Sequence, residues 1–189
     1  MKTEYEIRIL EIDHDEMVKK LEELGAELKF SRMQKRYVYD FNPVEPNKWI
    51  RLRTNGETTT LTIKNVAAKT IDGTKEQEVE VSDFDEMNGI LESLGYKSRG
   101  YQENKRTQYI LDGVEIDLDE WPLIPEYMEI EGKDSYEVMK ILNKLGIDKD
   151  RITTLDVASV YDQYGIDVLS VTHLKFEDGG KKLWKILKN

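Results

Sequence analysis

The chain has 189 residues, of which 39% are apolar and 35% are charged, and its formal net charge at pH 7 is −10. It contains no cysteine, which excludes disulfide bonds, zinc sites built from thiolates and a cysteine nucleophile. The negative charge opposes the attraction on which nonspecific nucleic-acid binding depends, so we expect no duplex DNA or RNA partner.

The length and the regular patterning predict a single folded domain. The chain opens directly into its first strand, and no apolar run reaches the roughly 18 residues that a membrane span needs. We therefore expect a cytoplasmic protein without a membrane partner. The sequence leaves a homodimer open.

The first predicted strand, residues 3–9, carries charge on alternate positions. Glu4, Glu6 and Arg8 share one face of the strand because strand side chains alternate with a period of two, and Tyr5, Ile7 and Ile9 share the other. Taken alone, such a face is typical of a solvated sheet surface with a cross-strand ion pair. A functional role depends on whether other strands repeat the pattern.

Three segments have the apolar period of amphipathic helices. The first begins near Asp13, which stands three residues before Glu16 in a capping-box arrangement, and Gly25 ends it. The other two end in the same way, at Gly95 and Gly146. Each apolar stripe must be covered, so we expect all three helices to pack on the rest of the domain.

Between the helices the apolar period changes to two, which predicts strands. Asn55-Gly56 and Asp112-Gly113 are typical of two-residue hairpin turns, so the strands on either side should be antiparallel. With the first strand there are eight strands, and the helices are inserted among them, which predicts an α+β fold with an antiparallel sheet. The seven further predicted strands cover residues 34–41, 48–54, 58–65, 75–82, 101–111, 113–119 and 126–131.

Six of the strands place charged residues on one face and apolar residues on the other. The basic and acidic side chains are also segregated by strand, which independent solvated faces would not require. Two geometries fit this pattern: an open sheet whose charged face meets water, or a closed barrel with the charged face inside and helices covering the outside. In a barrel, the enclosed charges would need metal, water or an anion to complete their pairing.

Two histidines, His14 and His173, are present, far apart in the sequence. We expect both at the surface. The sequence therefore predicts no histidine-based metal site.

The charged strands carry recognisable motifs in chain order. An ExExK-like motif spans Glu4 to Arg8, with arginine in the lysine position. The further motifs are RxR at Arg51 and Arg53, then Lys64, ExE at Glu78 and Glu80, the basic pair Lys105 and Arg106, an acidic strand through Asp117 and Asp119, and ExE at Glu129 and Glu131. With this ordered set the chain resembles the CYTH superfamily, also called the triphosphate tunnel metalloenzymes, over about residues 2–165.

The resemblance implies an eight-stranded antiparallel closed β-barrel with helices packed on its outside, whose tunnel binds a triphosphate with Mg²⁺ or Mn²⁺. The superfamily includes inorganic, thiamine and nucleoside triphosphatases and class IV adenylyl cyclases. We expect a tunnel-barrel domain over residues 1–165. Residues 166–189 lie beyond the matched motifs, and we expect them to form a C-terminal extension packed on the same domain. Within the extension we expect a surface turn at Asp178-Gly179-Gly180.

The resemblance also implies roles for individual residues. Arg8, Glu78 and Glu80 are the expected catalytic residues, Arg8 by stabilising charge and Glu78 or Glu80 by orienting a water. Hard Mg²⁺ and Mn²⁺ favour carboxylate oxygens, and arginine can bind two phosphoryl oxygens at once. The expected metal ligands are Glu4, Glu6, Glu129 and Glu131, with Asp117 and Asp119 on the acidic strand. The expected substrate-binding residues are Arg8, Arg51, Arg53, Lys64, Lys105 and Arg106.

Three functions fit this resemblance: hydrolysis of a small triphosphate, formation of cyclic AMP and pyrophosphate from ATP, and binding of polyphosphate or nucleotide without catalysis. Retention of the carboxylate pairs disfavours mere binding, for which the basic residues would suffice. Cyclases of this superfamily tend to carry an adjacent Ser-Tyr pair near the end of the domain, where this chain has Val160-Tyr161. The sequence therefore predicts a metal-dependent triphosphatase.

Overall fold

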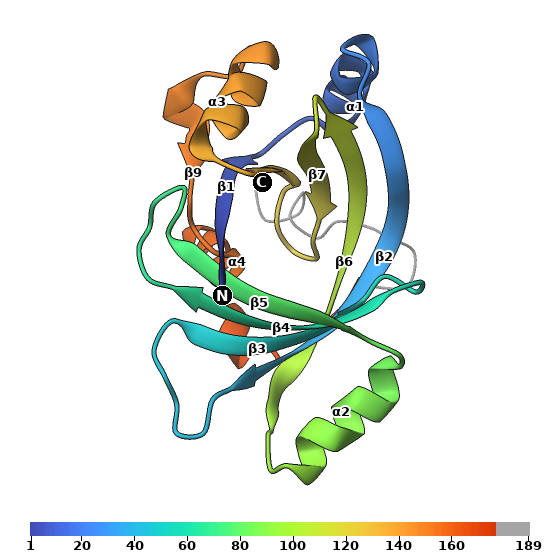
Figure 1. Ribbon diagram of the computed structural model, residues 1–189, viewed down its shortest axis with the longest axis vertical. Coiled ribbons are helices and arrows are strands. Elements are labelled where there is room, and N and C mark those ends of the chain that lie inside the picture. The colour runs from blue at the N-terminus through green and yellow to red at the C-terminus, as the bar shows by residue number, and fades with distance from the viewer. Residues whose placement is uncertain (177–189) are drawn as a thin grey trace.

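The computed structural model describes residues 1–176 as an eight-stranded antiparallel β-barrel with helices on its outside (Figure 1). The strand order is β6-β2-β3-β4-β5-β1-β8-β7, and pairing of β6 with β7 closes the barrel. The barrel strands are β1 Lys2–Leu10, β2 Glu27–Asp40, β3 Lys48–Thr54, β4 Thr59–Val66, β5 Thr74–Val81, β6 Ser98–Leu111, β7 Val114–Glu120 and β8 Tyr127–Gly132. Of the two geometries that fit the charge pattern, the closed barrel is confirmed.

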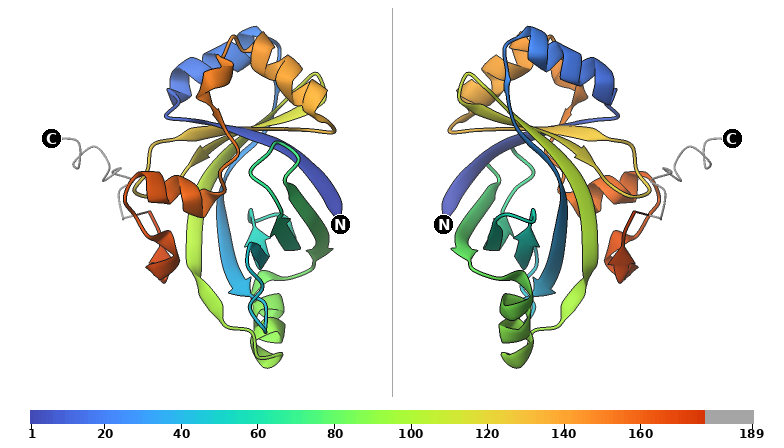
Figure 2. Two further views of the ribbon diagram at one scale, coloured as in Figure 1. Left: turned by 90° about the vertical axis from the view of Figure 1, so that its left-hand side faces the viewer. Right: turned by 90° about the vertical axis from the view of Figure 1, so that its right-hand side faces the viewer.

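Within residues 1–176, four α-helices lie outside the barrel: α1 His14–Glu23, α2 Phe84–Ser93, α3 Ser135–Lys144 and α4 Val157–Gln163. Figure 2 shows α1 and α3 next to each other at one end of the molecule and α2 at the opposite end. The short elements are η1 Lys149–Arg151, β9 Ile152–Thr153, η2 Val168–Ser170 and β10 His173–Leu174. Within residues 1–176 no helix is both long and apolar enough to cross a membrane.

The three expected helices form where the sequence predicts them. Asp13, Asp83 and Asp134 each cap a helix, since the side chain of each accepts a hydrogen bond from the backbone N–H three residues later. Gly25 and Gly95 follow the helix ends with φ of 77° and 90°, a left-handed conformation that glycine adopts without strain. Local capping therefore fixes where these helices begin and end.

Apolar side chains fill the space between the barrel wall and the helices. One cluster joins the outer faces of β1, β7 and β8 to α1 and α3, with Ile7, Ile116, Ile130, Leu21 and Leu142 all fully buried. Smaller clusters pack α2 on β2 and β3, and α4 on the β7–β8 loop. Because every helix covers the apolar face from outside, the charged face of each strand is turned inward.

Several elements differ from the sequence-based prediction: β2 is longer, and α4, η1, β9, η2 and β10 are not among the predicted elements. Strand β2 begins at Glu27 rather than at residue 34, because residues 27–33 pair with residues 105–110 of β6 across a bulge near Leu28. Helix α4 was not predicted, since its seven residues are too few to establish a helical period.

The described part of the C-terminal extension lies against the barrel domain. Val168 and Leu174 pack with Trp121 and Val160, and β10 adds to the edge of the sheet as a parallel partner of β6. The turn expected at Asp178-Gly179-Gly180 lies outside the described residues.

Candidate active site

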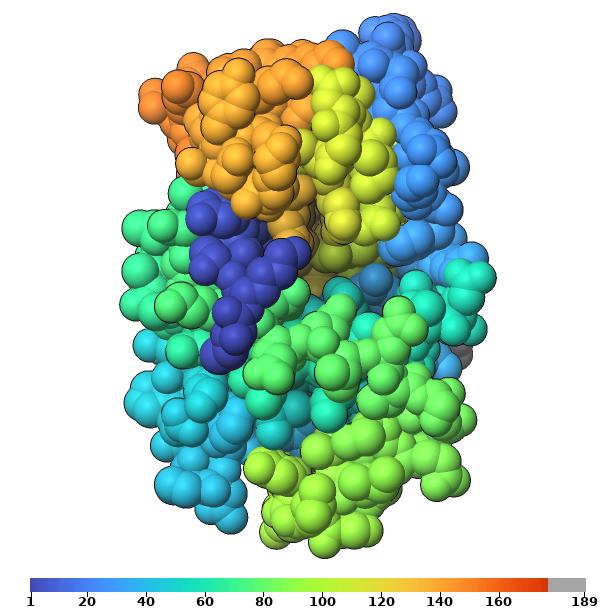
Figure 3. Space-filling view, in the orientation of Figure 1, coloured from blue at the N-terminus to red at the C-terminus, as the bar shows by residue number. Residues whose placement is uncertain are grey.

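The inward faces of the strands enclose a charged cavity of about 390 Å³. In the space-filling view the molecule is hollowed between the N-terminal strand, drawn in dark blue, and the segments coloured yellow and green (Figure 3). Every barrel strand contributes to the lining. The predicted site residues that line it are Glu4, Glu6, Arg8, Arg51, Arg53, Lys64, Glu78, Glu80, Arg106, Asp117, Glu129 and Glu131.

Three of the predicted metal ligands converge on one point of the cavity wall. Glu6 and Glu131 are directly opposite each other in the β1–β8 ladder. One carboxylate oxygen from each of Glu4, Glu6 and Glu131 lies within 4.8 Å of the other two. Antiparallel pairing of β1 with β8 therefore assembles an acidic triad from residues 125 positions apart in the chain (131 − 6).

The acidic triad is electrostatically unfavourable as it stands. Burial raises the pKa of Glu131 to about 8, with a further contribution from the negative charges of Glu6 and Glu4. Burial likewise raises the pKa of Glu4 and of Glu6. Like charges held together in this way are relieved by a cation. The oxygen-only donor set fits hard divalent ions such as Mg²⁺ or Mn²⁺.

Glu129 does not join the triad, although it was predicted to be a fourth ligand. It lies opposite Arg8 in the same ladder, and its Oε1 accepts a 2.7 Å hydrogen bond from Arg8 Nε while its Oε2 accepts a 2.6 Å bond from Arg106. Burial alone would raise the pKa of Glu129, but the two guanidinium groups hold it well below its usual range. Glu129 is thus a buried anion already neutralised by protein cations.

Asp117 and Asp119 also pair with arginine instead of converging on the triad. Arg106 Nε donates to Asp119 Oδ1 at 2.8 Å, and another nitrogen of Arg106 donates to Asp117 Oδ2 at 2.5 Å. Asp119 is fully buried and accepts a further bond from Asn104. Both aspartates therefore anchor Arg106, and neither is among the three carboxylates that converge.

The basic side of the cavity is formed by Arg36, Arg51 and Arg53. Arg36 and Arg53 are directly opposite each other in the β2–β3 ladder, so two like charges face one another. Burial, together with the neighbouring arginines, lowers the pKa of Arg36 to about 9 and that of Arg53 to about 10. Because Arg36 and Arg53 face each other at low pKa, an anion bound between them would stabilise both charges.

Arg36 is a cavity residue that the sequence analysis missed. It is 6% exposed, donates to Asn104 Oδ1 at 2.6 Å, and lies over the Trp121 ring at 4.4 Å. Lys35 and Arg36 are adjacent, so charge alone does not say which of them points inward. The neighbouring Tyr37 and Tyr39, which pack outside near α2, could have assigned Arg36 to the inner face.

Lys64 and Glu78 connect the two sides of the cavity. Lys64 Nζ contacts Glu4 Oε1 at 2.8 Å, so it partly neutralises the triad. Glu78 accepts a 2.5 Å hydrogen bond from Thr62 and lies 3.4 Å from Arg51, while Glu80 follows it on the same face of β5. Of the two expected catalytic glutamates, Glu78 therefore lies beside the arginines, and Glu80 lines the same cavity.

Lys105, expected to bind substrate, does not line the cavity. The strand alternation that turns Arg106 inward turns Lys105 outward, onto the face shared with the buried Tyr109 and Leu111. There it pairs with Glu120 at 2.9 Å. Of the basic pair, only Arg106 faces the cavity.

The raised pKa of Glu131 predicts a pH-dependent stability in the metal-free protein. Because the pKa is about 8 in the folded chain and near its usual 4.5 in the unfolded chain, the folded state binds more protons between these values, and stability falls as pH rises through that window. In chelator, Glu131→Gln should therefore melt at a higher temperature than the wild type at about pH 9, with little difference at about pH 5. Thermal melting at both pH values measures this, and an equal difference at both would contradict it.

Comparisons with known proteins agree with this arrangement. A family model described as the CYTH domain matches residues 2–154, which include every barrel strand. A structure from Pyrococcus horikoshii superposes with a TM-score of 0.70 and 21% identity, covering 81% of this chain and 96% of its own. No curated protein sequence matches the chain significantly.

Two further structures with the same fold have descriptions that mention an activity. A candidate adenylate cyclase from Vibrio parahaemolyticus has a TM-score of 0.72 at 14% identity, covering 85% of this chain and 98% of its own. A candidate adenylyl cyclase from Hippeastrum, described as having a dominant triphosphatase activity, has a TM-score of 0.58 at 15% identity, covering 89% and 99%. At these identities the similarity establishes a shared fold.

Proposed function

Because the chain belongs to the CYTH domain family, we propose that it is a metal-dependent triphosphatase that cleaves inorganic triphosphate or a nucleoside triphosphate inside the barrel. The observation that carries this proposal is the division of one cavity into two charged sides. The acidic triad of Glu4, Glu6 and Glu131 needs a cation, and the cluster of Arg36, Arg51 and Arg53 needs an anion. A triphosphate with a divalent metal supplies both.

The arrangement supports phosphoryl transfer by positioning and charge stabilisation. Bound at the acidic triad, Mg²⁺ or Mn²⁺ would neutralise phosphoryl charge during in-line displacement. The guanidinium groups of Arg51 and Arg53 would each bind phosphoryl oxygens through a forked pair of donors and hold the chain of phosphates across the cavity. Glu78, beside these arginines, or Glu80, in the same cavity, would orient the attacking water and accept its proton.

Hydrolysis is favoured over cyclisation by the environment of Tyr161. This residue stands where cyclases of the family carry the tyrosine of a Ser-Tyr pair, and its side chain is fully buried. Its hydroxyl donates to the Pro122 carbonyl oxygen at 2.7 Å and its ring packs on Trp121. A hydroxyl used in this way supports the loop behind the cavity and does not reach a substrate.

The products formed from ATP and from inorganic triphosphate test the proposal. With Mg²⁺ or Mn²⁺, chromatography should detect ADP and orthophosphate from ATP, and orthophosphate and pyrophosphate from triphosphate. Glu131→Gln should be inactive in the same assay, which would exclude a contaminating phosphatase. Cyclic AMP as the main product would show that the protein is a cyclase and not a hydrolase. Binding of triphosphate without turnover would show that it is a triphosphate-binding module.

Arg8 gives a second test, because it stands in the lysine position of the family motif. Its guanidinium contacts Glu6 and Glu129 and donates to the Leu155 carbonyl oxygen at 2.6 Å, so its charge lies beside one carboxylate of the triad. Arg8→Lys retains the charge and should keep substantial activity. Arg8→Ala should lose about 2 kcal/mol of transition-state stabilisation, or roughly 30-fold in kcat/KM. Unchanged kcat/KM in the alanine variant would remove Arg8 from the site.

A further inference from the structure

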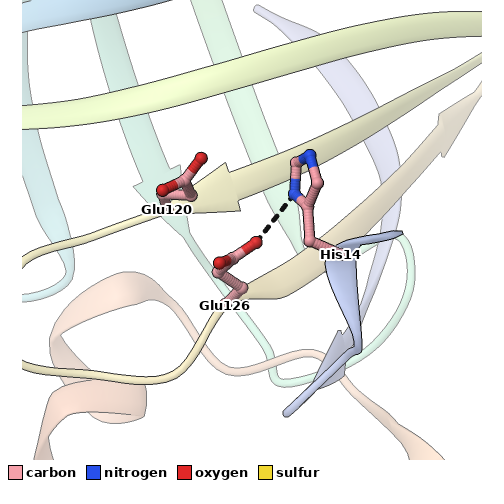
Figure 4. Close-up of side chains that lie close together, drawn as sticks. All are labelled: His14, Glu120 and Glu126. Atoms are coloured by element: carbon pink, nitrogen blue, oxygen red, sulfur yellow. Dashed lines mark ion pairs between the residues drawn. The ribbon is translucent and has the colours of Figure 1, made fainter. Parts of the chain in front are cut away.

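A second group of metal-ligating side chains lies outside the cavity, where the start of α1 meets the loop between β7 and β8 (Figure 4). One donor atom from each of His14, Glu120 and Glu126 lies within 4.8 Å of the other two. His14 Nδ1 is 2.7 Å from Glu126 Oε2. None of the three lines the charged cavity.

The strand alternation explains why this group points away from the cavity. Asp117 and Asp119 of β7 face inward, so Glu120, the next residue, faces outward. Glu126 directly precedes Tyr127, which is the first residue of β8 and lines the cavity. The two metal-ligating groups are therefore on opposite sides of the barrel wall.

The backbone that carries these side chains is held in place by its neighbours. Ile12 N donates to the Glu126 carbonyl oxygen at 3.1 Å, which joins the segment before α1 to the loop. Within the loop, Trp121 and Ile124 are buried in the cluster under α4, and Pro122 accepts the hydrogen bond from Tyr161. The three side chains thus project from a fixed frame, as a metal site requires.

The donor set differs in chemistry from the acidic triad. The triad offers oxygen alone, whereas this group offers one imidazole nitrogen and two carboxylates, the donor types of open zinc sites with three protein ligands and a water. In the structure, Lys105 Nζ forms an ion pair with Glu120 Oε1 at 2.9 Å. Its side chain is 42% exposed, so it can swing into solvent when a divalent ion takes its place.

We propose that His14, Glu120 and Glu126 form a second divalent-metal site, which takes Zn²⁺ or a similar first-row transition ion in preference to Mg²⁺. The ion links the start of α1 to the β7–β8 loop. That loop carries Trp121, which stacks on Arg36 of the cavity. The site is independent of the proposed triphosphatase function, since none of its ligands lines the cavity.

Zinc titration of the full chain tests the proposal, with the acidic triad disabled by Glu131→Gln and Mg²⁺ in excess. Calorimetry should find one Zn²⁺ per chain in this background. Adding His14→Ala should weaken zinc binding by more than about 100-fold, beyond what loss of a supporting outer-shell residue causes. Adding His173→Ala should leave it unchanged, because His173, the other histidine of the chain, lies on β10.

A spectroscopic measurement on the wild-type chain, without a histidine tag, covers the case in which His14→Ala fails to fold. Zn²⁺ should shift the imidazole ¹⁵N resonances of His14, whereas Mg²⁺ should not. The His14 resonances are those that remain in the spectrum of the His173→Ala variant. Equal zinc affinity with and without His14, or no zinc-dependent shift of its ring, would show a plain His14–Glu126 ion pair and overturn the proposal. The two proposals can fail separately: absence of turnover in the product assay would contradict the triphosphatase function and would not change the zinc-binding result.

Discussion

Glu6→Gln should abolish metal-dependent triphosphate turnover while leaving the barrel folded. The substitution removes one of three convergent carboxylates, so we expect divalent-metal affinity to fall by more than about 100-fold, beyond the effect of an outer-shell change. The fold should persist because, without metal, Glu6 is held near Glu4 and Glu131 and its pKa is raised by burial. Metal titration by calorimetry and turnover at saturating substrate measure the two effects.

Glu115→Gln is the matched control for this experiment. Glu115 lies on β7 opposite Glu131 and lines the same cavity, but its carboxylate is not part of the triad. The same chemical change there should alter metal affinity only slightly. Equal losses in Glu6→Gln and Glu115→Gln would indicate that the general negative charge of the cavity, and not the triad, attracts the metal.

Arg106→Ala should cause the largest loss of stability of any single change in the cavity wall. The guanidinium of Arg106 bonds to Asp117, Asp119 and Glu129, and its removal leaves three buried carboxylates short of a counter-charge. Breaking a buried ion pair typically costs about 3–5 kcal/mol. For a chain of this length that corresponds to a fall in Tm of roughly 10 °C, measurable by circular dichroism.

Arg53→Ala, unlike Arg106→Ala, should not lower the stability of the fold. Burial and the neighbouring Arg51 and Arg106 depress the pKa of Arg53, so its removal relieves repulsion and should leave Tm unchanged or slightly higher. Substrate affinity should nevertheless fall, because a phosphate-binding cation is lost. If Arg106→Ala kept the wild-type Tm, or Arg53→Ala fell as far as Arg106→Ala, this division between structural and substrate-binding arginines would be wrong.

The alternation of charged and apolar residues by itself determined which side chains could share a face. Glu4, Glu6 and Arg8 alternate with Tyr5, Ile7 and Ile9 whatever the fold, because strand geometry has a period of two. Helix caps and hairpin turns were likewise predictable, since Asp13 and Gly25, or Asp112-Gly113, act through local backbone geometry. From pattern alone, open sheet and closed barrel stayed equal alternatives, and only the resemblance in motif order favoured the barrel.

The tertiary structure decided which of the inward charges meet. Pairing register places Glu6 opposite Glu131 and Arg8 opposite Glu129. Three of the six expected metal ligands converge, while the other three, Glu129, Asp117 and Asp119, pair with arginine. Adjacent residues such as Lys105 and Arg106 have different environments because successive side chains of a strand point to opposite faces. A shift of register by one residue would exchange those faces.

The contacts that the sequence could not predict are those between distant segments. Arg36 reaches the cavity because β2 pairs with β3, and His14 meets Glu120 and Glu126 because α1 packs beside the β7–β8 loop, more than 100 residues along the chain (120 − 14 = 106). Periodicity describes each strand or helix separately and carries no information on which of them become neighbours. Barrel closure and helix packing supply that information, because they bury the apolar faces together and leave the charged side chains to meet on either side of the wall.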